Sequence, residues 1–124
     1  KLTPVILKNS QEYIAKKYGV EENHIDFVFH GGSGSTVEEI REGISYGVIK
    51  MNIDTDLQYA YLEGIRDYMG EKKDYLATQI GNPEGSDVPN KKYYDPRKWL
   101  REGELTFKAR LKKAFEDLNN VNTL

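Results

Sequence analysis

Hydrophobic residues recur at helical spacing near the start of the chain. Leu7, Ile14 and Tyr18 share one face of a helix that this pattern predicts over residues 4–18. Thr3 is of a type that caps helix starts, and Gly19 is of the type that ends helices. The chain is therefore expected to open with an amphipathic helix.

Two short apolar stretches, residues 25–30 and 48–53, are typical of buried strands. Between them, Ser35 and Glu38 have the spacing of a capping box, and the helix that they start is expected to end at Gly47. The first half of the chain thus alternates helix, strand, helix and strand. This order indicates an α/β fold with a parallel sheet.

A long amphipathic helix is predicted to begin at Asp54 or Thr55. Its apolar stripe repeats at intervals of three and four residues: Leu57, Ala60, Tyr61, Gly64, Ile65 and Tyr68. A short helix is expected over 75–80 and a final helix over 104–118. The segment between them, 81–103, is expected to be irregular because it is rich in turn residues, aromatics and charges. No third strand is predicted.

Two parallel strands cannot form a complete sheet, because both faces of such a sheet need cover. The second strand is expected to bury Ile49, Met51 and Ile53 under helices and to carry Val48, Lys50, Asn52 and Asp54 on its other face. A polar inner face is typical of a closed barrel near its active-site mouth. Solvated edge positions for Lys50 and Asn52 are the alternative. With no Met at its start, the chain is expected to be part of a longer protein.

The composition of the chain excludes several kinds of site and protein. The chain has 124 residues and a net charge of -2, so nothing in it favours nucleic-acid binding. It has no Cys, which excludes disulfides and Cys-based metal sites and fits a reducing compartment. No apolar run approaches the roughly 18 residues that a membrane span needs.

The segment 30–35, HGGSGS, is a candidate phosphate cradle at a strand-to-helix turn. Its glycines allow backbone N–H groups to approach an oxyanion, and a helix N-terminus adds positive potential. It lacks the Lys of a Walker A loop and the third glycine of the dinucleotide fingerprint. The turn 52–56, NIDTD, also opens a helix, and two such neighbouring turns are typical of barrel phosphate sites. The alternatives are a flexible turn and simple helix capping.

His30 is a candidate metal ligand, since neutral imidazole is the commonest metal donor in proteins. A catalytic zinc usually has three protein ligands, and His24 is expected at the opposite end of the strand. The chain therefore supplies one ligand only, and a structural role is the alternative for His30. Arg97 is a candidate phosphate ligand, with a surface ion pair to Asp95 or Glu102 as the alternative.

Three motifs resemble class II fructose-1,6-bisphosphate aldolases: FVFHGGSGS at 27–35, GVIKMNIDTD at 47–56, and GNPEG with PNKKYYDPRKWLREGE within 81–104. The resemblance covers essentially the whole chain and is to the C-terminal third of that enzyme. It implies the last strands and helices of a (β/α)8 TIM barrel in residues 1–80, and an active-site arm with a C-terminal helix in residues 81–124. It also implies a cytoplasmic homodimer that needs zinc or another divalent metal. The implied reaction is the reversible cleavage of fructose 1,6-bisphosphate to dihydroxyacetone phosphate and glyceraldehyde 3-phosphate, in glycolysis and gluconeogenesis.

The resemblance also implies roles for single residues. His30 matches a zinc ligand, and Gly31 and Ser33 match residues at a monovalent cation. The positions that match substrate-binding residues are Gly31, Ser33, Asn52, Asp54, Thr55, Lys91 and Arg97. Arg97 would reach the second phosphate from the neighbouring subunit.

The catalytic base and two further metal ligands have no match in this chain. Three alternatives stay open: a related aldolase of tagatose or sedoheptulose bisphosphate, a non-catalytic phosphate-binding module, and a flavodoxin-like nucleotide domain. The last would need two or more further strands.

Overall fold

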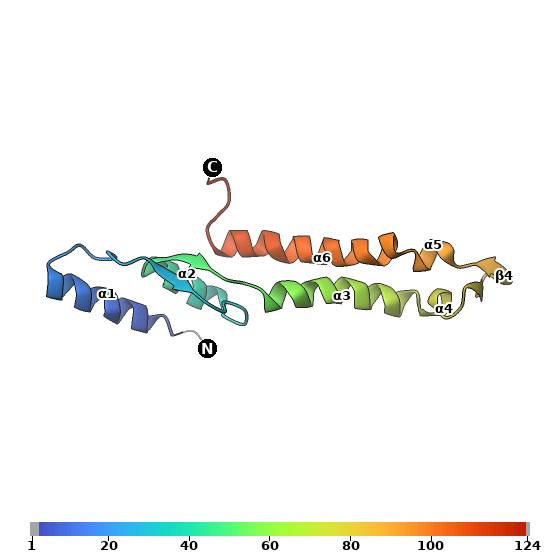
Figure 1. Ribbon diagram of the computed structural model, residues 1–124, viewed down its shortest axis with the longest axis horizontal. Helices are drawn as coiled ribbons and strands as arrows, with labels where there is room; N and C mark the ends of the chain where they lie inside the picture. The colour runs from blue at the N-terminus through green and yellow to red at the C-terminus, as the bar shows by residue number, and fades with distance from the viewer. Residues whose placement is uncertain (1–2, 124) are drawn as a thin grey trace. The chain divides into compact units, whose positions relative to one another are not determined.

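The computed structural model describes residues 3–123. The chain is α/β and divides into two compact units (Figure 1). The first unit comprises the described part of residues 1–56 together with 113–124, and the second comprises residues 57–112. Among the described residues, no helix is long and apolar enough to cross a membrane.

The first unit opens with helix α1 (Val5–Tyr18), which ends as predicted at Gly19. Gly19 adopts φ 67°, a left-handed conformation that glycine takes without strain, and its N–H donates to the carbonyl of Ala15. Pro4 directly precedes the helix, and no side chain caps its start, so the prediction of a Thr3 cap was wrong.

Strands β1 (Phe27–Phe29) and β2 (Val48–Met51) form a parallel pair, as predicted, with α2 (Val37–Ser45) between them in the chain. Both strands are shorter than the predicted stretches. Helix α2 begins one residue later than the predicted capping box. Thr36 Oγ1 accepts from the Glu39 N–H at 3.1 Å, and Glu39 Oε2 accepts from the Thr36 N–H at 3.0 Å. The cap is therefore Thr36, not Ser35.

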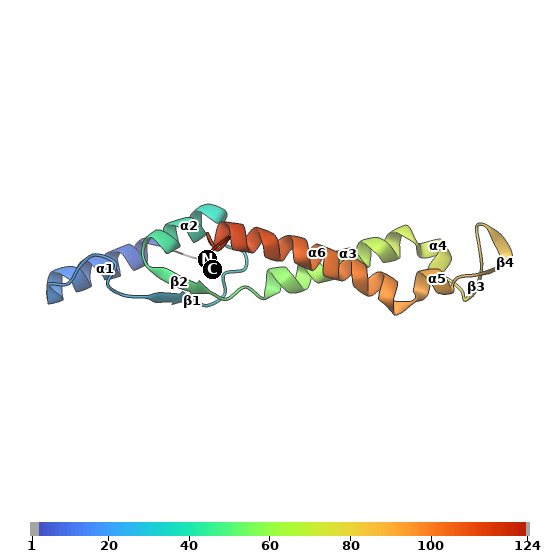
Figure 2. The same ribbon diagram turned by 90° about the horizontal axis from the view of Figure 1, so that it is seen from above.

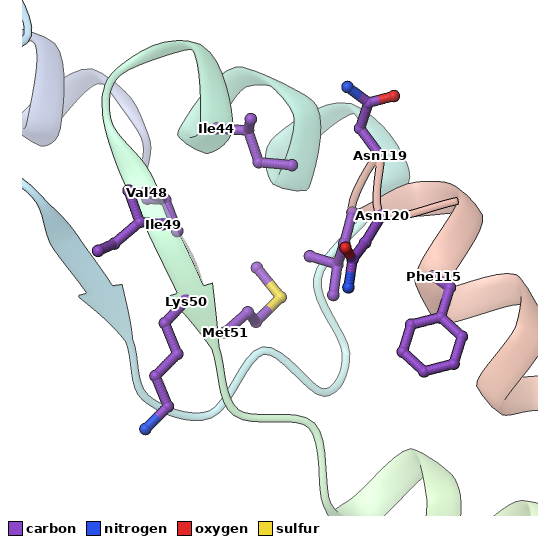
Figure 3. Close-up of a pocket in the computed structure, with 9 residues that line it drawn as sticks. Ile44, Val48, Ile49, Lys50, Met51, Phe115, Asn119 and Asn120 are labelled. Carbon is purple, nitrogen blue, oxygen red and sulfur yellow. The ribbon is translucent and has the colours of Figure 1, made fainter. Parts of the chain in front are cut away.

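An irregularity in β2 overturns the predicted faces of Val48 and Ile49, whereas Lys50 and Asn52 are exposed and Met51 and Ile53 are partly buried, as predicted. Phe27 pairs with Val48 and Val28 pairs with Lys50, so Ile49 has no partner in the register. Such a bulge reverses the alternation of side chains beyond it. Val48 is consequently buried, whereas Ile49 is 68% exposed. Figure 3 shows Lys50 and Met51 leaving the strand in opposite directions.

The core of the first unit is small, and Phe29, Ile40, Val48 and Ala114 are among its buried apolar residues. A Cβ on Gly43 of α2 would lie 2.7 Å from the Phe29 ring, so glycine lets the helix approach the strands closely. The other buried anchor is polar. The Gln11 side chain donates to the carbonyls of Ile25 (2.7 Å) and Tyr46 (3.0 Å), and it accepts from the Ile25 N–H at 3.1 Å. This single side chain ties α1 to both strand connections.

The second unit is built mainly from α3 (Thr55–Glu71) and α6 (Pro96–Asp117), which lie side by side in both views (Figures 1 and 2). Helix α3 begins where the sequence predicts, and Ala60 and Gly64 of its predicted stripe are buried. Gly64 packs against the Glu102 carbonyl and the Thr106 hydroxyl, and the rings of Tyr61 and Phe107 meet edge to face at 6.4 Å. Small residues and aromatics thus bring the two helices together.

The region between these helices is more regular than predicted. It contains α4 (Lys73–Leu76), β3 (Ile80–Asn82), β4 (Gly85–Pro89) and α5 (Lys91–Tyr94). β3 and β4 form an antiparallel hairpin, so the expectations of no further strand and of an irregular segment 81–103 were wrong. The short helix expected over 75–80 is present but lies at Lys73–Leu76. Helix α6 starts at Pro96 rather than near residue 104. Pro suits the first helical position, and Asp95 before it is a good cap type, which is the signal that the prediction missed.

Candidate functional site

The carboxyl ends of β1 and β2 lie together because the strands are parallel. His30 follows β1 and Asn52 follows β2, and the backbone joins the two segments. The Asn52 N–H donates to the Phe29 carbonyl at 2.9 Å, and the Gly32 N–H donates to the Asn52 carbonyl at 2.9 Å. The Asn52 side-chain amide lies 3.3 Å from Nδ1 of His30. Both side chains are exposed, so the contact orients the imidazole without covering it.

The glycine turn after His30 depends on backbone conformations that favour glycine. Gly31 adopts φ 75° and Gly34 adopts φ 81°. Gly32 is buried, and a Cβ there would lie 2.5 Å from the sulfur of Met51. The turn can therefore rest directly on the end of β2, which places its backbone beside Asn52.

Ser33 connects this turn to the start of α3. Its hydroxyl oxygen accepts from the Asp56 N–H at 3.2 Å, so one of the free donors at the helix start is satisfied from the neighbouring turn. Thr55 is the first residue of α3, and Asp54 precedes it; both are exposed. The N-terminus of a helix attracts anions through its remaining N–H groups and its dipole. The two predicted turns thus form one exposed polar surface at the end of the parallel strands.

The first unit supplies a single imidazole to this surface. His24 precedes β1 and His30 follows it, so they lie at opposite ends of the strand. Among residues 3–123 there is no group of three or more His, Asp or Glu side chains that could hold a metal ion. The exposed His30 ring fits one position in a metal coordination shell. The remaining ligands would have to come from outside the described residues.

Lys91 and Arg97 belong to the second unit. Lys91 is the first residue of α5 and is exposed. The guanidinium of Arg97 forms a bidentate pair with Asp95, with 2.9 Å from Nε to Oδ1 and 2.5 Å from Nη2 to Oδ2. The predicted alternative of an ion pair with Asp95 is therefore present, whereas no pair with Glu102 is formed. The guanidinium nevertheless remains open to solvent, so the ion pair does not preclude a ligand.

Sequence reasoning missed the residue that organises this part of the chain. Asn90 is fully buried, and its side chain donates to the carbonyls of Thr78 and Gly81, both at 2.9 Å. Its Oδ1 accepts from Asn82 at 2.6 Å, and its N–H donates to the Gln79 carbonyl. Asn90 thus holds the β3–β4 hairpin directly before Lys91. A lone Asn between Pro and Lys carries no sequence signal for such a role.

A pocket of ≈ 410 Å³ lies elsewhere in the first unit, between α2, β2 and the end of the chain (Figure 3). Its walls are mixed: Ile44, Val48, Met51, Phe115 and Leu118 are among the apolar lining residues, and Lys50, Asn119 and Asn120 are polar. None of the predicted metal or substrate residues lines it. The candidate site is therefore the exposed surface at the strand ends and not this pocket.

A family profile described as "Fructose-bisphosphate aldolase class-II" matches residues 1–123. The chain is 57% identical over 123 residues to "Fructose-bisphosphate aldolase class 2" of Escherichia coli K12, covering 99% of this chain and 34% of that protein. It is 57% identical over 125 residues to "Fructose-bisphosphate aldolase 1" of Paracoccidioides lutzii, covering 100% of this chain and 35% of that protein.

The same similarity holds in three dimensions. A crystal structure of fructose-bisphosphate aldolase from Campylobacter jejuni matches with a TM-score of 0.91 and 56% identity, over 100% of this chain and 36% of that one. The chain thus spans about a third of the length of the curated relatives that it matches.

Proposed function

Because the chain belongs to the class II fructose-bisphosphate aldolase family, we propose that it forms the C-terminal third of a metal-dependent aldolase that reversibly cleaves fructose 1,6-bisphosphate. The products are dihydroxyacetone phosphate and glyceraldehyde 3-phosphate. The observation that carries this proposal is the surface on which His30, Ser33 and Asn52 meet, in a chain 57% identical to proteins of that name. Residues 1–80 would complete a (β/α)8 barrel, and residues 81–124 would form the arm and the C-terminal helix.

The metal of this proposal is zinc or a similar divalent ion. His30 would be one of its ligands, because its imidazole is exposed and its orientation is fixed by Asn52. When bound, such a metal acts as a Lewis acid that polarises the ketone of the substrate. The base that removes or returns a proton, and two further ligands, would come from other parts of the protein.

One substrate phosphate would rest on the glycine turn and the start of α3. Backbone N–H groups of the turn, the Ser33 hydroxyl and Thr55 offer donors there, and the dipole of α3 favours the anion. The carboxylate of Asp54 would repel a phosphate, so we assign Asp54 and Asn52 to substrate hydroxyls. Carbonyl and hydroxyl oxygens at Gly31 and Ser33 would also suit a monovalent cation.

The second phosphate would bind to the arm. Lys91 is a compact cation and Arg97 a planar one, and guanidinium groups hold phosphate through two parallel hydrogen bonds. We assign Arg97 to the active site of the neighbouring subunit in a homodimer. A reducing, cytoplasmic location agrees with the lack of Cys in the chain.

Cleavage of fructose 1,6-bisphosphate by the full-length protein, with coupled detection of dihydroxyacetone phosphate, tests the proposal. We expect turnover that a chelator abolishes and a divalent metal restores. Tagatose and sedoheptulose bisphosphates in the same assay test the related aldolases, and faster turnover of either would replace fructose in the proposal. Phosphate-ester binding without any cleavage would instead support a non-catalytic module.

A further inference from the structure

Asp95 and Arg97 form a closed arrangement at the start of α6. Asp95 Oδ1 accepts from the Arg97 backbone N–H at 3.0 Å and from Nε at 2.9 Å, while Oδ2 accepts from Nη2 at 2.5 Å. The Asp95 carboxylate therefore caps α6 at the Arg97 backbone N–H and also binds the guanidinium of Arg97. The Arg97 side chain is fixed at both its backbone and its charged end.

The two partners differ in exposure. The Asp95 side chain is 17% exposed, whereas that of Arg97 is 88% exposed. A guanidinium has five N–H donors, of which Asp95 takes one on Nε and one on Nη2. The remaining donors, including both on Nη1, are free of this pair, and the side chain that carries them is exposed. The arrangement presents a fixed cation with an open hydrogen-bonding edge.

The same carboxylate lies beside the second cation of the arm. The Asp95 N–H donates to the Lys91 carbonyl at 3.0 Å, which closes the single turn of α5. The pKa of Asp95 is held well below its usual range, mainly by the Arg97 side chain, then by the Arg97 backbone N–H, with a smaller effect of the Lys91 charge. Asp95 is therefore ionised at any assay pH near neutrality, and in the chain it lies between the two predicted phosphate-binding cations, Lys91 and Arg97.

We propose that Asp95 is a positioning residue that presents Arg97 to the second phosphate of the substrate. The inference rests on the proposed role of Arg97 in bisphosphate binding. An unrestrained Arg side chain loses rotamer freedom when it binds a ligand, and a side chain that is already held loses less. Asp95 would thus increase affinity for the bisphosphate although it carries the same sign of charge as the phosphate.

Asp95→Ser in the full-length, metal-loaded enzyme separates the two roles of Asp95, which are capping α6 and holding the Arg97 guanidinium. Ser caps helices as well as Asp does, so α6 should keep its start, while the grip on the guanidinium is lost. We expect the KM for fructose 1,6-bisphosphate to rise by about two- to tenfold with little change in kcat, from the rotamer freedom that Arg97 regains. Cleavage of fructose 1-phosphate, which lacks the second phosphate, should be unchanged. Asp95→Asn, which keeps the shape but not the charge, provides the same test should the Ser variant fold poorly.

The Arg97→Ala variant and the double variant Asp95→Ser/Arg97→Ala complete a double-mutant cycle. If Asp95 acts through Arg97, the Asp95 substitution changes nothing further once Arg97 is absent. A raised KM in Arg97→Ala with a normal KM in Asp95→Ser would overturn the positioning role alone. A lower KM for the bisphosphate in Asp95→Ser would also overturn it. So would an equal loss of activity toward fructose 1,6-bisphosphate and fructose 1-phosphate. An unchanged KM in Arg97→Ala would overturn the proposed role of Arg97 itself, and the inference with it.

Discussion

The side chains of His30 and Asn52 lie 3.3 Å apart although 22 positions separate them in the chain. The contact exists because β1 and β2 are parallel neighbours, so the residues that follow them meet at one edge. It joins the proposed metal ligand to a proposed substrate ligand. An imidazole whose second nitrogen has a fixed partner is held in one orientation, which strengthens metal binding.

Asn52→Ala should therefore weaken metal binding as well as substrate binding. Partners of metal-ligating histidines typically contribute about 10–100-fold in affinity, and we expect a loss in that range. Titration of the chelated full-length protein with zinc, read by isothermal calorimetry, measures it. Asn9→Ala, the same substitution at an exposed position of α1, serves as the control. A zinc affinity equal to that of the control would show that Asn52 does not orient His30.

Gln11→Leu should destabilise the first unit. The substitution leaves both backbone groups of Ile25 and the carbonyl of Tyr46 without their partner in a part-buried region. Buried backbone groups without hydrogen-bond partners destabilise the folded state. We expect a loss of about 2–4 kcal/mol in the free energy of unfolding. Denaturant unfolding of the full-length protein measures it, with Lys16→Leu at an exposed position of the same helix as control. Equal midpoints for the two variants would contradict the role given to Gln11.

Asn90→Ala should loosen the arm. Its side chain makes three hydrogen bonds that hold the β3–β4 hairpin. The two strands contain no buried apolar residue that could hold the hairpin in their place. We expect faster amide hydrogen exchange over residues 78–90 and a higher KM for the bisphosphate, because Lys91 follows directly. Asp87→Ala, at an exposed position of β4, should change neither. Unchanged exchange in the Asn90 variant would mean that the hairpin is held by other contacts.

Arg97→Ala should raise the KM for fructose 1,6-bisphosphate and leave cleavage of fructose 1-phosphate nearly unchanged. Loss of a charge-assisted contact costs about 2–3 kcal/mol of transition-state stabilisation. Mixing Arg97→Ala subunits with His30→Ala subunits shows which active site Arg97 serves. If it acts across a dimer, both lesions fall in one site of each heterodimer, and up to half of the wild-type activity per dimer returns. Heterodimers that form without recovered activity would mean that Arg97 serves its own subunit or does not bind substrate.

The local signals in the sequence predicted the first unit well. Gly19 ended α1, the apolar stretches formed two parallel strands, and α3 began at Thr55. The faces of Val48 and Ile49 were not predictable, because the unpaired Ile49 interrupts the alternation and nothing in the local sequence marks a bulge. The cap of α2 fell one position from its prediction because Ser35 and Thr36 are both good caps, and each has a Glu three residues on.

In the candidate site, too, some residues could be predicted from the sequence and others could not. Its exposed residues, such as His30 and Asn52, follow strands and could be found from strand order. The buried Asn90 that supports the arm could not be found in this way, because it acts by hydrogen bonds to backbone carbonyls 9 and 12 positions away. Asn90 has no periodic pattern around it, and hydrogen bonds rather than a core hold the hairpin between α4 and α5. Two supporting residues did have a signal: Gln11 is a polar residue within the apolar face of α1, and Asp95 is a good cap type directly before Pro96.

The metal content of the His30→Ala variant tests the central claim most directly. The full-length wild-type protein should hold a divalent metal in stoichiometric amount, measured by plasma mass spectrometry on dialysed samples. The variant should lose the metal and nearly all turnover of fructose 1,6-bisphosphate while its circular dichroism stays the same, since one ligand of a three-residue set is gone. Stoichiometric metal together with near-normal turnover in His30→Ala would contradict the account.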